Sequence, residues 1–143
     1  MRLVIGCALT ALACSHPQPA LLPPPDPFLV RVDNAELIGQ LRRMISEVIT
    51  TEAQDREHVK VAAEVSRRRL FVGRSEREIM ETLGRAHFNA CTGEGYCLGE
   101  GAVRALRVDI GQLPPRSTGG TPVLVIRLDR QDICTGTHLF HEQ

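Results

Sequence analysis

Cysteine is the residue type with the most potential chemistry in this chain. The 143-residue sequence contains five, at positions 7, 14, 91, 97 and 134. Between Cys91 and Cys97 lies Thr-Gly-Glu-Gly-Tyr, in which the glycines allow the backbone to turn back on itself. We therefore expect a local Cys91–Cys97 disulfide, worth about 2 kcal/mol for so small a loop. Bridges from Cys134 to either of these cysteines are the alternative, because spacing alone does not fix connectivity.

A zinc site is the second chemistry that these residues suggest. Cys91, Cys97, Cys134 and His138 are all of the ligand types that zinc prefers. Cys134 and His138 lie in a segment with strand-like alternation, which would place them about 13 Å apart along one face. Because that distance is too large for one ion, we expect no metal and no cofactor.

Catalysis would need a nucleophile with a base, or paired carboxylates. The candidates are Cys97 or Cys134 with His87 or His138, and the carboxylates Asp109, Asp129 and Asp132. An exported cysteine is more often bridged or buried than nucleophilic, and Asp129 and Asp132 lie where a turn is expected. We therefore expect a protein that is not an enzyme.

The first 14 residues, MRLVIGCALTALAC, have the composition of an export signal. Arg2 precedes an apolar run from Leu3 to Ala13, shorter than the roughly 20 residues that cross a bilayer as a helix. With Cys14 directly after Ala11-Leu12-Ala13, the segment resembles a bacterial lipoprotein signal. The resemblance implies that residues 1–13 are a signal peptide and that Cys14 carries the lipid, including palmitate. Ala11-Leu12-Ala13 also fits an ordinary signal-peptidase site, which would leave Cys14 unmodified.

A proline-rich segment follows. Six prolines lie between Ser15 and Pro27, and such chains favour an extended polyproline II conformation that rises about 3.1 Å per residue. Residues 14–28 are therefore expected to be a tether between the lipid and a single domain formed by residues 29–143.

Charge and aromatic content exclude one class of partner. Of 17 basic residues one, Arg2, lies in the leader, which leaves 16 against 17 acidic residues in the mature chain. Nucleic-acid binding depends on neutralised phosphates and aromatic stacking, and the chain has four Phe, one Tyr and no Trp. We expect no nucleic-acid partner.

The domain is expected to begin with helices over about residues 34–83. Asp33 or Asn34 caps the first, whose apolar residues recur at steps of three and four. A charged helical segment runs from about Glu52 to Arg69 and ends in three arginines, which are typical of a solvated helix end. Residues 34–70 are compatible with one bent helix or with two. Ser75 and Glu78 then predict a capping box for a short helix, which Gly84 ends in a left-handed conformation.

Alternation of period two replaces the helical pattern over about residues 102–140. Three segments show it, around Leu106–Ile110, Leu124–Asp129 and Ile133–Leu139. The polar stretch 129–132 predicts a hairpin between the last two, and the Pro- and Gly-rich stretch 111–122 predicts a long loop. We expect an α+β fold, with N-terminal helices packed on a three-stranded antiparallel sheet whose other face is partly exposed.

The motif Gly73-x-Ser75-x-x-Glu78-Ile79-x-x-x-Leu83-Gly84-x-Ala86, followed by strands, resembles the SmpA/OmlA (BamE-like) family of small outer-membrane lipoproteins over about residues 72–140. The resemblance implies a non-catalytic binding or scaffold module in outer-membrane assembly or envelope maintenance. By the sorting pattern of such lipoproteins, Ser15 in place of Asp after the expected lipidated cysteine implies the outer membrane. The expected partners are the membrane, through the lipid, and an envelope protein that contacts the sheet face or the loops 91–97 and 111–122. A secreted inhibitor-like or ligand-binding domain without an anchor is the alternative.

Overall fold

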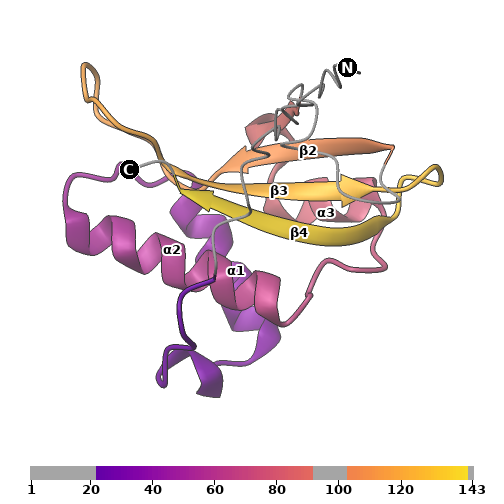
Figure 1. The fold of residues 1–143 in the computed structure, drawn as a ribbon, viewed down its shortest axis with the longest axis horizontal. Coiled ribbons are helices and arrows are strands. Elements are labelled where there is room, and N and C mark those ends of the chain that lie inside the picture. Colours follow the sequence, from indigo (N-terminus) through magenta and orange to yellow (C-terminus); the bar gives the residue numbers. More distant parts are fainter. Residues whose placement is uncertain (1–21, 92–102, 142–143) are drawn as a thin grey trace, which may run out of the picture.

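A computed structural model describes residues 22–91 and 103–141 of the chain (Figure 1). The elements in chain order are the 3-10 turn η1 (Leu29–Arg31), helices α1 (Asn34–Ile45), α2 (Glu52–Arg67) and α3 (Glu76–Leu83), the turn η2 (Arg85–His87), and strands β1 (Phe88–Ala90), β2 (Arg104–Asp109), β3 (Pro122–Leu128) and β4 (Cys134–His141). The sheet is antiparallel throughout, with strand order β1-β2-β3-β4. The α+β prediction is confirmed. No helix in these residues is both long enough and apolar enough to span a membrane.

The first helical region forms two helices. Asp33 caps α1 by accepting a hydrogen bond from the Glu36 amide at 2.9 Å. Thr51 begins α2 with a capping box, in which its side chain and that of Gln54 bond to each other's backbone amides. The linker between the helices is joined to the loop that follows β2, since the Ile49 amide donates to the carbonyl of Gln112 at 2.8 Å.

Helix α3 begins and ends where the sequence predicts. The Ser75 amide donates to the Glu78 carboxylate at 2.8 Å, and the Glu78 amide donates to the Ser75 hydroxyl at 3.3 Å. Hydrogen bonds from Ser75 lower the pKa of Glu78. Gly84 follows with φ of +101° and ψ of 112°, so φ is positive as predicted although the conformation is not the left-handed helical one.

The sheet has a fourth strand, and the three-stranded prediction is wrong on this point. Strand β1 pairs with β2 through Phe88 opposite Val108 and Ala90 opposite Leu106. Three residues are too few to show alternation, so only pairing with β2 makes this segment a strand. The predicted hairpin between β3 and β4 is confirmed, and Asp129 closes its turn by accepting from the Gln131 and Ile133 amides at 2.8 and 3.0 Å.

Two apolar clusters lie on opposite faces of the sheet. The main core joins the helices to one face through Leu106, Val108, Leu124, Ile126 and Leu128, with α2 packed on β3 and β4. In Figure 1, α1 and α2 lie below the sheet. Ala105, Val123, Val125 and Phe140 form the second cluster, in which Val125 is fully buried. The centre of this face is therefore closed, while Arg107 and Asp109 on the same face of β2 have 39% and 42% of their side chains exposed, so this face is partly exposed, as expected.

Candidate functional site

The cysteines that the structure describes lie on different faces of the sheet. Cys134 is a free thiol, buried in the main core, and burial raises its pKa. Cys91 follows β1, donates its amide to the Ala105 carbonyl at 3.1 Å and packs against the second cluster. The alternative bridge from Cys91 to Cys134 would have to cross the sheet. Cys14 and Cys97 lie outside the described residues, so the Cys91–Cys97 bridge stays a prediction.

A β-bulge separates Cys134 from His138. Leu128 pairs with Cys134 but Arg127 pairs with Gly136, so Thr135 is the extra residue. The shift turns Cys134 toward the helices and leaves His138 on the other face opposite Val125, which corrects the expectation of a shared face. Burial, with the positive charge of Arg127, lowers the pKa of His138. In the residues that the structure describes, no group of three or more His, Cys, Asp or Glu side chains could hold a metal ion.

Non-reducing peptide mapping of the protein should therefore return a bridged Cys91–Cys97 peptide and a free Cys134. The reason is that Cys134 is enclosed by the main core while Cys91 faces away from it. A bridge that contains Cys134 would contradict the described core, and separate free thiols at positions 91 and 97 would contradict the predicted pairing.

Part of the stretch expected to be a tether, the segment directly before α1, is fixed to the domain. We call residues 22–33 the strap. Arg67 donates to the carbonyl of Pro23, and Lys60 forms an ion pair with Asp26 at 2.9 Å. Contacts with α2 therefore begin at Pro23, several residues before the expected start of the domain at position 29.

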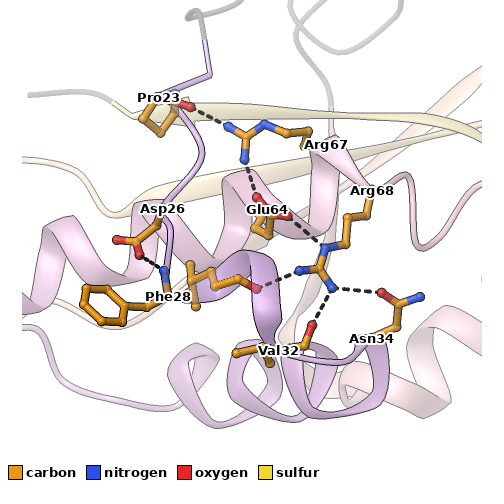
Figure 2. Close-up of polar contacts among 9 residues, drawn as sticks. Pro23, Asp26, Phe28, Val32, Asn34, Glu64, Arg67 and Arg68 are labelled. Carbon is orange, nitrogen blue, oxygen red and sulfur yellow. Dashed lines mark hydrogen bonds and ion pairs between the residues drawn. The ribbon is translucent and has the colours of Figure 1, made fainter.

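A buried carboxylate organises the strap (Figure 2). Glu64 has 5% of its side chain exposed and receives hydrogen bonds from Arg67 and, at 2.8 Å, from Arg68 Nε. Arg68 also donates to the carbonyls of Leu29 and Val32, each at 2.7 Å. We call Glu64, Arg67 and Arg68 the Glu64 clamp. Arg67 and Arg68, two of the three arginines expected to be solvated at the helix end, therefore hold the strap in place. Glu64, one helical turn earlier, was the sequence feature that could have predicted this ion-paired role.

The strap contains a tight turn held from both sides. Asp26 Oδ1 accepts from the Phe28 amide at 2.8 Å, and its carbonyl accepts from the Val30 amide at 3.1 Å. The hydrogen-bonded ion pair with Lys60 is the main cause that lowers the pKa of Asp26. Leu29 is buried in the main core. The turn is therefore a fixed part of the domain.

A hollow of about 620 Å³ lies beside the strap. It is lined by Pro23 of the strap, by Glu52, Asp55, Arg56, Val59 and Lys60 of α2, by Gly119-Gly120 of the long loop, and by His141. On its wall the His141 Nε2 and Asp55 Oδ2 atoms are 2.8 Å apart. Sequence reasoning missed this pair, because Asp55 and His141 belong to elements at opposite ends of the domain.

The hollow combines charged and apolar groups. A carboxylate can orient a histidine whose other nitrogen acts as a general base. The described residues that line the hollow include no Ser, Thr or Cys. Lys60 and Arg56 are each paired, with Asp26 and Glu52. The hollow therefore offers paired charges and apolar surface to a polar ligand or peptide.

Comparison with known proteins adds no relative. No protein-family model, no curated protein and no solved structure matches this chain. The resemblance to SmpA/OmlA lipoproteins rests on the motif alone.

Proposed function

We propose that the chain is an outer-membrane lipoprotein that faces the periplasm, with a non-catalytic domain that binds a protein of the cell envelope. The observation that carries this proposal is Cys14, placed directly after an apolar leader and Ala11-Leu12-Ala13. The proline-rich segment after Cys14 supplies a spacer, and the strap attaches its end to α2. A lipid at Cys14 would thus be linked to the domain through a defined contact.

Three features support a binding role for the domain. The long loop between β2 and β3 is rich in Pro and Gly and contributes Gly119-Gly120 to the hollow. The hollow joins this loop to the strap and α2 in one continuous surface. The short capped helix α3, followed by the sheet, has the order of elements in SmpA/OmlA lipoproteins, which suggests outer-membrane assembly or envelope maintenance as the setting.

Cys14→Ser should move the protein from the membrane pellet to the soluble periplasmic fraction. We expect the variant to be lost completely from the membrane pellet, because a serine cannot receive the thioether-linked lipid and the described residues include no membrane-spanning helix. Labelled palmitate should enter the wild type and not the variant. Ser15→Ala is the matched control and should stay in the pellet. A wild type without label that fractionates like Cys14→Ser would contradict the proposal.

A secreted ligand-binding domain is the second candidate, and the hollow with its Asp55–His141 pair is the observation that favours it. Chemical crosslinking in native membranes, followed by purification of the chain, separates the two. An envelope protein crosslinked at the 111–122 loop or α2 supports the scaffold role. A soluble protein that carries no labelled palmitate and has no crosslinked partner supports the secreted ligand-binding domain.

A further inference from the structure

The outer surface of the strap is apolar. Five large hydrophobic side chains are exposed in the described residues, and three belong to the strap: Leu22 at 39%, Phe28 at 85% and Val30 at 57%. Three of the prolines between them, at positions 24, 25 and 27, are also exposed. Asp26 is the one charged residue from position 22 to 30, and Lys60 neutralises it at 2.9 Å. Such a surface at one site indicates an interaction with an apolar partner.

Phe28 and Val30 project from a fixed support. Leu29 between them is buried, and Arg68 donates a hydrogen bond to the Leu29 carbonyl. Asp26 binds the amides of both Phe28 and Val30. The two exposed side chains therefore need little further ordering of the backbone when they meet a partner.

We propose that Phe28 and Val30 insert into the membrane leaflet that carries the lipid on Cys14, so that the strap seats the domain directly on the bilayer. This inference rests on the proposed lipid anchor. Leu22 follows Cys14 by eight residues, which span at most about 30 Å. A strap confined so close to the headgroups meets the bilayer at a high effective concentration. Burial of two side chains is too weak to capture a free protein, but it can orient one that is already tethered.

The position of the strap determines which part of the domain would face away from the membrane. In Figure 1 the strap, drawn in indigo, starts beside α2 and then turns below the helices. Its first part, at Pro23, lines the hollow together with His141 and Gly119-Gly120. The long loop between β2 and β3 extends at the upper left of the same view. With the turn of the strap on the membrane, the tip of this loop points away from the bilayer, where an envelope partner can reach it.

Tryptophan fluorescence tests the insertion directly, because the chain contains no Trp. Phe28→Trp places one reporter on the strap, and Val103→Trp is the matched control at a residue that is 51% exposed next to β2. Each variant, expressed with residues 1–13 and purified from membranes, is reconstituted into vesicles of phosphatidylethanolamine and phosphatidylglycerol with and without brominated acyl chains. In vesicles we expect a blue shift and quenching of the emission of the Phe28→Trp variant, and neither effect for the Val103→Trp variant.

Mass spectrometry of the same samples reports acylation at Cys14 separately. If Cys14 is acylated and the Phe28→Trp reporter stays solvent-exposed and unquenched, the insertion is wrong while the lipid anchor stands. If Cys14 is unmodified, the anchor is wrong and the insertion falls with it. A concentration-dependent blue shift in detergent-free solution without vesicles would show that the strap docks on a second copy of the chain, which also overturns the insertion.

Discussion

Glu64→Ala is expected to lower the free energy of unfolding by about 3 kcal/mol, because removing one partner of a buried ion pair leaves the other uncompensated. Glu64 is buried and receives hydrogen bonds from both Arg67 and Arg68. Arg68 in turn holds the Leu29 carbonyl. Loss of the carboxylate should therefore loosen the strap as well as α2, and urea unfolding followed by circular dichroism measures the change.

Glu57→Ala is the matched control for this prediction. Glu57 lies on the same helix with an exposed side chain, and exposed substitutions of this kind usually change stability by less than about 0.5 kcal/mol. Glu64→Gln keeps one oxygen acceptor and should lose less than Glu64→Ala. Equal losses for Glu57→Ala and Glu64→Ala would show that the Glu64 clamp contributes nothing specific.

Gly111→Ala is expected to have a comparably large effect, about 2 to 5 kcal/mol, from backbone strain together with overpacking. Gly111 has φ of +112°, and a Cβ atom there would lie 2.6 Å from Ile49 Cδ1 and 3.3 Å from His58 Cδ2. Ile49 is 6% exposed and His58 is 2% exposed, so neither can move aside freely. The contact joins the end of β2 to the α1–α2 linker and to α2.

Gly119→Ala separates strain from steric overlap. Gly119 has φ of +117°, but a Cβ atom there would have no neighbour within 4 Å. Both substitutions carry the strain of a positive φ, and only the one at position 111 adds the clash. Thermal unfolding should show a larger loss for Gly111→Ala by about 1 to 3 kcal/mol. Equal losses would mean that the linker yields without cost and that the close approach does not stabilise the fold.

The features that the sequence determined by itself are those made by near neighbours in the chain. Ser75 and Glu78 cap α3 across three residues, and Asp33 caps α1 in the same way. Thr51 and Gln54 form a capping box at the start of α2, and the spacing rule that predicted the Ser75–Glu78 box also fits this pair. Applied there, the rule would have predicted that residues 34–70 form two helices. Strands β2, β3 and β4 followed from alternation, because the pleat repeats every two residues.

Tertiary structure decided the features that join distant residues. Strand β1 exists because β2 offers it an edge, and the bulge at Thr135 exists because β3 sets the register of β4. Asp55 meets His141, and Arg68 meets the Leu29 carbonyl, only after α2 has packed against the sheet and the strap. No local pattern encodes these pairs, since each depends on the relative placement of elements that the whole core determines.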